Sequence, residues 1–389
     1  MTRALPPLSA WSSAVIAALI GFGGTIALIV QAMQAMGASV LQTASAVTAL
    51  CLGIALAGTA LSWRLRIPVV LAWSTPGAAL LAASGAASPV SWPMAVGAFV
   101  CAAVLMILLG AIPALGRLAE RIPGAIASAM LAGILLPFCL GLFKVAGADP
   151  LLVTLILIVF LAARQRAPLY ALLLALGSGA ALSLLRGDLK PLPPGATLGV
   201  LSPAMPSAQI GTLIGIGVPL FLVTLVSQNL PGLLVLRTAG YQPKPAPLLT
   251  VTGIASLIGA PFGAHGVNLA AITAAICTSS DAHPDHARRW SVGLLYAGCY
   301  LVLALFSPIL VRFFLALPHD VIAALTGLAL IPALLGATEG AMAAREERDA
   351  AITTLLVTAS GLTLFHLGAA FWGLAAGFVA LGIRAALKR

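Results

Sequence analysis

Residues 258–290 read IGAPFGAHGVNLAAITAAICTSSDAHPDHARRW, and this stretch interrupts an apolar segment that is otherwise suited to cross a membrane. Pro261, Gly263 and Gly266 break the helical pattern, while His265 and Asn268 add polar side chains within the same few positions. Backbone that leaves a helix at bilayer depth has no water to bind, so it persists only where protein or a cavity surrounds it. Broken segments of this kind mark the substrate site in transporters. The stretch therefore predicts a binding site inside a membrane protein.

The composition assigns the whole chain to the membrane class. Apolar residues make up 61% of the 389 residues and charged residues 8%, with a mean hydropathy of +1.11, whereas soluble domains are about 45–50% apolar and about 25% charged. All ten acidic residues fall between apolar runs or at their edges. The net charge of +10 comes from basic residues scattered singly or in pairs, which argues against a nucleic-acid partner. The five cysteines stand alone in apolar runs, so we expect no metal site and no cofactor.

Fourteen segments are expected to cross or enter the bilayer, because a spanning helix needs about 20 mostly apolar residues. The first seven lie near 10–32, 38–62, 67–87, 92–112, 123–146, 148–163 and 168–185, and the second seven near 208–230, 245–260, 261–278, 286–310, 318–337, 349–365 and 367–385. Segments 3 and 10 are the interrupted ones, each with a short strand before a half-length helix. Residues 191–207 form a proline-rich connector that is too polar to span. It separates a first repeat, 1–190, from a second, 208–389.

Similarity between the halves predicts a duplicated unit. Three short matches link them: Leu28–Gln31 with Leu225–Gln228, the run from Pro68 with the run from Pro261, and the pair Pro123 and Pro137 with Pro318 and Pro332. The matches keep their order at offsets of 197, 193 and 195 positions. When a unit with an odd number of spans is duplicated, the second copy has the opposite orientation in the membrane. We therefore expect an all-α polytopic membrane protein built as a 7+7 inverted repeat.

The basic residues predict the orientation of this repeat independently. With both termini cytoplasmic, 16 of the 20 basic residues fall on the inner side, as the positive-inside rule requires. The inner set is Arg3, Arg64, Arg66, Arg117, Arg121, Arg164, Arg166, Arg237, Lys244, Arg288, Arg289, Arg345, Arg348, Arg384, Lys388 and Arg389. The outer set is Lys144, Arg186, Lys190 and Arg312. The connector is therefore expected on the outer, periplasmic side.

The two broken segments also predict the charge of the ligand. Ser74 and Thr75 are good N-cap residues, and Pro76 suits the first turn of a helix. Asn268 is expected to cap a second half-helix in the same way. Two helix N-termini that share a cavity each carry about half a positive charge and favour an anion. The alternative is that glycine and proline here only allow close helix packing. The expected strands are Ile67–Trp73 and Ala260–Gly266, and the expected half-helices are Pro76–Ser84 and Leu269–Cys277.

The same residues resemble one bacterial family. The run Pro261–Thr278 with the following Ala282–Asp285 and Arg288–Arg289, the run Ile67–Leu81, and Ser227–Gly232 (SQNLPG) are similar to the bacterial benzoate–proton symporters. The resemblance covers nearly the whole chain. It implies proton-coupled import of benzoate or a similar aromatic carboxylate across the bacterial inner membrane, by a transporter and not an enzyme. It also implies the fold of the uracil and anion transporters, with a core domain of segments 1–4 and 8–11 and a gate domain of segments 5–7 and 12–14.

Residue roles follow from this resemblance together with side-chain chemistry. Polar groups at the two breaks are expected to receive the carboxylate, and neighbouring aromatic rings to contact the ring of the substrate. The expected substrate-binding residues are Trp73, Ser74, Thr75, Gln228, Asn229, Phe262, Gly266 and Asn268. His265 is the expected proton carrier, because an unperturbed imidazole titrates near pH 6.5. Fold analogy alone suggests a homodimer formed through the gate domain.

Structural explanations of these polar residues stay open beside the functional ones. Hydrogen bonding between helices would account equally for Asn229, and less readily for Gln228. His265 could be a hydrogen-bonded core residue. Residues 281–286 contain two aspartates and two histidines, but they fall in a predicted inner loop between basic residues, which favours a solvated loop over a metal site.

Other functions remain as alternatives. Nucleobase–proton symporters of the same fold carry carboxylates in the equivalents of segments 8 and 10, whereas this chain offers Gln228, Asn229 and Asn268 there, which suit an anion better. An inorganic-anion transporter is also possible. An integral-membrane enzyme is disfavoured because the sequence lacks the common catalytic motifs. Nothing indicates the continuous polar lining of a channel.

Overall fold

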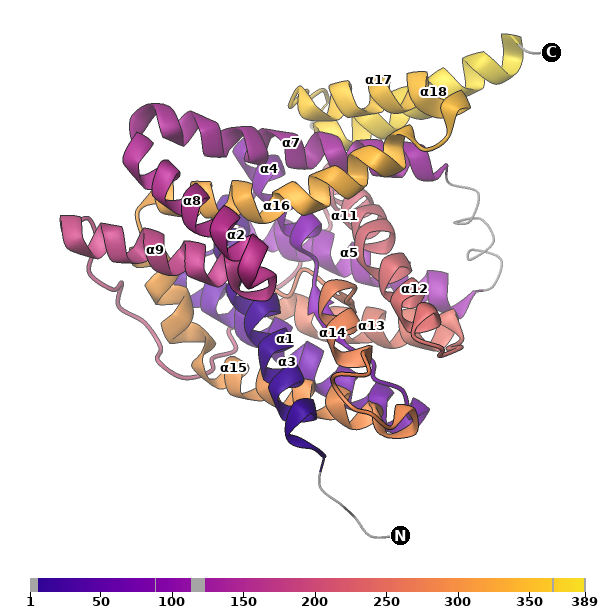
Figure 1. Ribbon diagram of the computed structural model, residues 1–389. Helices are drawn as coiled ribbons and strands as arrows, with labels where there is room; N and C mark the ends of the chain where they lie inside the picture. Colours follow the sequence, from indigo (N-terminus) through magenta and orange to yellow (C-terminus); the bar gives the residue numbers. More distant parts are fainter. Residues whose placement is uncertain (1–5, 88, 113–122, 366, 388–389) are drawn as a thin grey trace.

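The computed structural model describes residues 6–87, 89–112, 123–365 and 367–387. Within them the chain is almost entirely helical, and the expected fourteen segments are present in order (Figure 1). Ten of the described helices are long and apolar enough to cross a membrane. Segments 3, 6, 10 and 13 are the shorter ones. The basic residues Arg3, Arg117, Arg121, Lys388 and Arg389 lie outside the described residues.

The first half runs from α1 to α9. Its elements are α1 (Leu8–Gly23), α2 (Ile26–Ala35), α3 (Val40–Leu65), β1 (Leu71–Trp73), α4 (Thr75–Ala87), α5 (Trp92–Ala111), α7 (Gly124–Ala148), α8 (Pro150–Arg166) and α9 (Ala171–Arg186). Segment 1, expected as an ordinary span near 10–32, is divided into two helices. The helix breaks between α1 and α2 at Gly24 and Thr25, where Gly21, Gly23 and Gly24 weaken the helical preference.

The second half runs from α10 to α18. Its elements are α10 (Ile210–Thr212), α11 (Val218–Thr224), α12 (Leu230–Thr238), α13 (Pro245–Gly259), β2 (Val267–Leu269), α14 (Ile272–Thr278), α15 (Trp290–Ala316), α16 (His319–Met342), α17 (Arg348–Ala359) and α18 (Ala369–Leu387). Two π-helical stretches, Leu213–Gly217 and Leu225–Asn229, join α10, α11 and α12 into one continuous segment 8. Segment 13 ends at Ala359 and not near 365, because Gly361 turns the chain with φ +70°.

The strands β1 and β2 join the two halves at the centre of the fold. They pair antiparallel, with Leu71 opposite Leu269, Ala72 opposite Asn268 and Trp73 opposite Val267. An antiparallel pairing is what an inverted repeat requires of equivalent strands. The long helices α7 and α16 show the same correspondence, because each follows a proline N-cap and carries one internal proline, Pro137 or Pro332.

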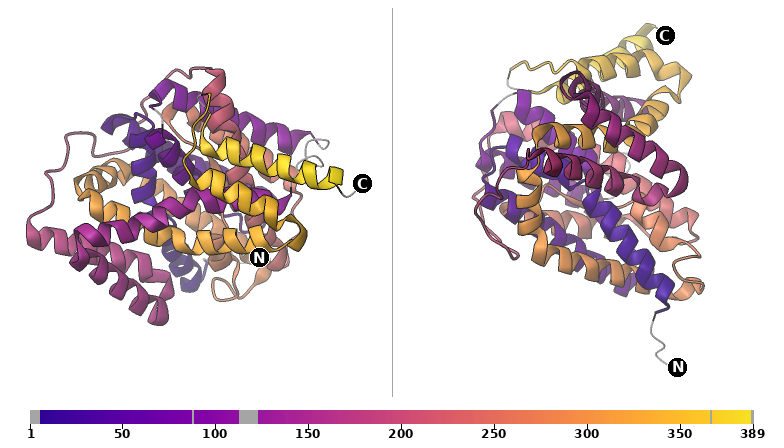
Figure 2. Two further views of the ribbon diagram at one scale, coloured as in Figure 1. Left: turned by 90° about the horizontal axis from the view of Figure 1, so that it is seen from above. Right: turned by 60° about the vertical axis from the view of Figure 1, so that its left-hand side comes forward.

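Helix packing separates the chain into two groups. Helices α7, α8, α9, α16, α17 and α18 pack mainly on one another, as do α1, α3, α5, α13 and α15 (Figure 1). The further views keep α17 and α18 together at one edge of the molecule (Figure 2). The division into a core and a gate domain, and the movement of one against the other, stay predictions.

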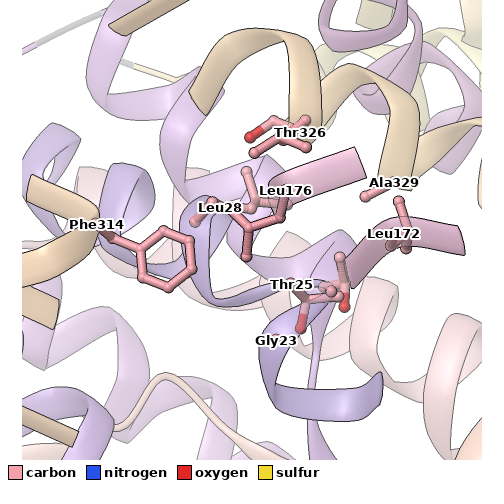
Figure 3. A pocket seen from close by; sticks show the side chains of 12 residues that line it. Gly23, Thr25, Leu28, Leu172, Leu176, Phe314, Thr326 and Ala329 are labelled. Atoms are coloured by element: carbon pink, nitrogen blue, oxygen red, sulfur yellow. The ribbon is translucent and has the colours of Figure 1, made fainter. Parts of the chain in front are cut away.

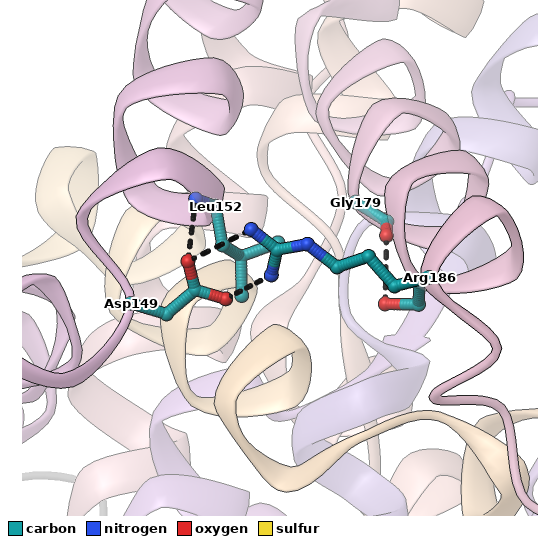
Figure 4. A network of polar contacts seen from close by, with 5 residues as sticks. Asp149, Leu152, Gly179 and Arg186 are labelled. Atoms are coloured by element: carbon teal, nitrogen blue, oxygen red, sulfur yellow. Dashed lines mark hydrogen bonds and ion pairs between the residues drawn. The ribbon is translucent and has the colours of Figure 1, made fainter.

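Contacts between loops join parts that the expected topology places on the same side of the membrane. On the side expected to be outer, Arg186 at the end of α9 pairs with Asp149, which also caps α8 by accepting the Leu152 N–H at 3.0 Å (Figure 4). On the side expected to be inner, Arg384 pairs with Glu346 at 3.1 Å. Which side faces the cytoplasm stays a prediction.

Candidate functional site

A turn that requires glycine leads from the end of segment 9 into segment 10. Helix α13 ends at Gly259, a 3-10 turn covers Ala260–Phe262, and Gly263 follows with φ +97°. A Cβ at Gly263 would lie 2.7 Å from the Trp92 ring and 2.8 Å from Ala46. The turn therefore packs directly on α3 and α5, and it delivers His265 into the interior of the protein.

His265 crosses from segment 10 to the start of the half-helix in segment 3. Its side chain is 2% exposed, and its Nε2 lies 3.2 Å from the carbonyl oxygen of Ser74. A carbonyl only accepts hydrogen bonds, so Nε2 carries the hydrogen and donates it. The other nitrogen, Nδ1, is buried and has no hydrogen-bond partner within the described chain. The neutral ring thus presents a free lone pair at Nδ1.

Ser74 fulfils the role expected of it as the cap of α4. Its Oγ accepts the Gly77 N–H at 2.9 Å, and its carbonyl oxygen accepts the Ala78 N–H at 2.9 Å. Thr75 is the first residue of the helix and is half-buried. The N-terminus of α4 therefore lies beside the imidazole of His265, at the junction of the two broken segments.

Asn268 does not cap the second half-helix, so this expectation is wrong. It lies inside β2, and α14 begins four residues later at Ile272. The strand is Val267–Leu269, not Ala260–Gly266, because the glycine turn uses the earlier residues for a reversal of the chain. Asn268 instead pairs with Asn229, whose Nδ2 donates to the Asn268 Oδ1 at 2.9 Å.

Asn229 ties segment 8 to β2 with two hydrogen bonds, because its Oδ1 also accepts the Leu269 N–H at 3.0 Å. It is fully buried. Asn229 therefore has a structural role, through hydrogen bonds to a strand and not to another helix, and its contribution to binding stays a prediction. The Nδ2 of Asn268 is buried without a partner in the described chain, whereas Gln228 is half-buried in the π-helical stretch.

A narrow hollow lies where segments 1 and 3 face segments 7 and 12 (Figure 3). Its cavity volume is about 10 Å³, about the space of one water molecule and far below the roughly 300–1,000 Å³ of small-molecule sites. Three threonine hydroxyls, Thr25, Thr75 and Thr326, lie among aliphatic side chains and Phe314. Its further lining residues are Gly23, Gly24, Ala27, Leu28, Leu172, Leu176, Leu325 and Ala329. The hydroxyls give this otherwise apolar hollow a polar side, but in this conformation it is too small for a small-molecule ligand.

The two expected aromatic contacts do not line this hollow. Trp73 is 2% exposed, packs on Phe22 with ring centroids 5.3 Å apart, and donates its indole N–H to Thr25 Oγ1 at 2.7 Å. Phe262 is half-buried in the turn before His265. Trp73 therefore reaches the hollow only through Thr25, and the roles of both rings in binding stay predictions.

Sequence reasoning missed the residues that the hollow adds. Thr25 and Thr326 were not singled out, and Leu172 and Leu176 come from a segment expected in the gate. A signal for Thr25 was present, since the run from Gly21 to Thr25 contains three glycines. No comparable signal marks Thr326, because its place opposite segment 1 depends on packing between distant helices.

Residues 281–286 form a loop with its own internal contacts; its position on the inner side stays a prediction. His283 Nδ1 accepts the Asp285 N–H at 3.1 Å. His286 stacks on Tyr241 with centroids 4.2 Å apart. Asp285 caps a short turn by accepting the Ala287 N–H at 2.9 Å. These side chains hold the loop together, in line with the loop interpretation.

Two broken segments that meet in a buried sheet, within a fourteen-segment helical protein, define a membrane transporter. The family described as benzoate membrane transport protein matches residues 5–383. The chain belongs to that family, and it is not an enzyme.

Two relatives cover nearly the whole chain. One is the inner membrane protein YdcO of Escherichia coli K12, 39% identical over 94% of this chain and 93% of its own length. The other is the benzoate membrane transport protein of Acinetobacter baylyi, 35% identical over 96% of this chain and 94% of its own.

Solved structures show the same fold at low identity. The transmembrane domain of the cyanobacterial bicarbonate transporter BicA is similar with a TM-score of 0.60 at 17% identity, over 96% of both chains. SLC26A9 is similar with a TM-score of 0.66 at 14% identity, over 97% of this chain and 65% of its own. The SLC26-like fold agrees with the expected inverted repeat of anion transporters.

Proposed function

We propose that this protein imports benzoate or a similar aromatic carboxylate together with protons across the bacterial inner membrane. Family membership and the similarity to the benzoate membrane transport protein of Acinetobacter support the substrate class. The E. coli relative, an inner membrane protein, supports the location. Nucleobases and inorganic anions are the competing substrates on this fold.

One observation carries the proposal: the free polar atoms of the buried site suit an anion and a proton. His265 Nδ1 is a buried acceptor and Asn268 Nδ2 a buried donor, both without partners in the described chain. No Asp, Glu, Lys or Arg is buried among the described residues. A carboxylate entering this site therefore meets no fixed negative charge that would repel it, and no fixed positive charge that would hold it permanently.

Coupling follows from the electrostatics of this arrangement. Protonation of His265 at Nδ1 would place a positive charge beside the α4 N-terminus, which itself favours an anion. A bound carboxylate would stabilise that charge in turn, so each ligand raises the affinity for the other. We expect the apolar part of the substrate to lie near Thr75 and the hollow, between the two helix groups, where separation of the groups would make room for it and movement of one group against the other would expose it to either side.

Uptake into proteoliposomes tests the proposal directly. Labelled benzoate is followed with an imposed inward proton gradient, with a protonophore control and protein-free vesicles for passive leak. We expect protein-dependent accumulation that the protonophore abolishes, and competition by substituted benzoates but not by uracil or bicarbonate. If uracil or bicarbonate competes and substituted benzoates do not, the substrate is a nucleobase or an inorganic anion and not benzoate.

His265→Gln tests the proton carrier. Glutamine keeps an N–H donor for the Ser74 carbonyl but does not titrate, so we expect the fold to survive and proton-driven accumulation to be lost. The matched control is His283→Gln at the other buried histidine, in the inner loop, which should accumulate benzoate as the native protein does. Accumulation by His265→Gln protein with an unchanged proton dependence would remove His265 from the mechanism.

A further inference from the structure

The connector between the repeats is bound along its length to one of the two helix groups. The Arg312 Nε of α15 donates to the Pro193 carbonyl at 2.6 Å, and the Gly199 N–H donates to the Leu305 carbonyl of α15 at 2.8 Å. The Ser207 N–H reaches α5. Every described hydrogen bond from 191–207 to another part of the chain goes to segments 2, 4, 10 or 11. All of these segments belong to the expected core.

The centre of the connector lies on the turn that carries His265. The Ala204 N–H donates to the Pro261 carbonyl at 2.8 Å. Beside it, Ser45 Oγ of α3 accepts the Ser202 N–H at 2.8 Å and donates to the Phe262 carbonyl at 2.9 Å. Two consecutive carbonyls of the turn, which the break in segment 10 deprives of helical partners, are therefore satisfied from outside segment 10.

Ser45 is the meeting point of three separate parts of the chain. It is completely buried in α3, and its single hydroxyl links the connector to segment 10. Three residues after Phe262, His265 makes its 3.2 Å contact with Ser74. A Cβ at Gly263, between them, would clash with Ala46 and Trp92. The position of the imidazole thus depends on how the turn is seated on α3.

We propose that residues 191–207 act as a strap that fixes the broken turn of segment 10, and that Ser45 is a positioning residue for His265. The strap donates one backbone N–H, that of Ala204, directly to the turn. A second, that of Ser202, is linked to the turn through the Ser45 hydroxyl. This inference rests on the proposed function for the importance of His265, but the strap itself is independent of the identity of the substrate.

Ser45→Ala tests the proposal, with Ser202→Ala as the matched control. The first variant removes the hydroxyl that joins strap and turn. The second leaves that link intact, since Ser202 takes part through its backbone. For Ser45→Ala we expect amide hydrogen exchange over residues 261–270 to be about two- to tenfold faster, the equivalent of one lost hydrogen bond. We also expect the KM for benzoate to rise by a similar factor and the pH profile of uptake to shift. Ser202→Ala should match the native protein in all three.

Each result decides one part of the proposal. Unchanged exchange in Ser45→Ala protein overturns the strap, and faster exchange with unchanged KM and pH profile overturns the positioning role. Should Ser45→Ala protein fail to fold, Ala204→Pro deletes the neighbouring N–H donor without altering α3, and the same outcomes apply. Failure of the native protein to take up benzoate refutes the proposed function alone, because the exchange measurement still decides whether the strap holds the turn.

Discussion

Asn229→Ala is expected to destabilise the protein far more than the same change at its neighbour Gln228. The amide of Asn229 is fully buried and makes two hydrogen bonds to β2, one with the Asn268 side chain at 2.9 Å and one with the Leu269 N–H at 3.0 Å. Alanine removes both and fills less space. Gln228 is half-buried and is a candidate substrate-binding residue. It makes no described hydrogen bond to β2.

The magnitude follows from the two bonds. Hydrogen bonds between membrane helices contribute about 0.6 kcal/mol each on average, which gives about 1 kcal/mol for the pair. The Leu269 N–H is then left buried without an acceptor, at a cost of about 1–3 kcal/mol. We therefore expect the free energy of unfolding to fall by about 2–4 kcal/mol for Asn229→Ala, and by less than about 0.5 kcal/mol for Gln228→Ala.

Reversible unfolding in bicelles measures both values, and benzoate uptake is measured on the same preparations. Asn229→Ala should lose stability, whereas Gln228→Ala should keep its stability and take up less benzoate. Equal stability of Asn229→Ala and native protein would refute the structural role of this amide. Asn229 would then be assigned a role in substrate binding alone.

Two further predictions concern packing and charge. Gly232→Ala should lower the free energy of unfolding by about 1–3 kcal/mol, because the new Cβ would lie 2.6 Å from the Leu269 Cβ. The control is Gly298→Ala, where a Cβ would meet no atom within 4 Å. In the same unfolding assay it should be neutral or slightly stabilising. The hydrogen bond from Arg186 holds the pKa of the Asp149 carboxyl below its usual range. The pair therefore stabilises the folded protein above the unfolded-state pKa of aspartate, about 3.9, and this contribution is lost as the pH falls through the folded pKa. Asp149→Asn should lower the Tm at pH 7, and the difference from native protein should shrink as the pH falls below about 4, whereas a constant difference would show that the charge is not its cause.

The broken segments show how far local sequence signals reach. Proline and glycine located both breaks, and the serine before the helix-forming run located the cap at Ser74. The same reasoning gave Asn268 a capping role, because it assumed that equivalent positions in two repeats have equivalent structures. Gly263 and Gly266 reverse the chain in segment 10, so β2 begins later than expected. Segment 3 has no glycine at those positions.

Residues whose roles depend on distant partners could not be assigned in advance. Thr326 lies on the hollow because α16 packs opposite the break in segment 1, and Ser45 matters because the connector crosses α3. Neither residue differs in its local sequence from other hydroxyl residues of the helices. Asn229 was correctly left between two interpretations, since only the position of β2 decides that its amide is used for structure.

The sequence by itself determined the membrane class, the fourteen segments and the two breaks, because hydropathy and helix breakers act over a few neighbouring residues. It also carried the resemblance that the family match confirmed. Only the tertiary structure decided which polar groups meet: His265 with Ser74, Asn229 with Asn268, and Ser45 with the connector. Each of these contacts joins residues far apart in the chain, and the apolar packing of whole helices sets their separation to within the range of a hydrogen bond.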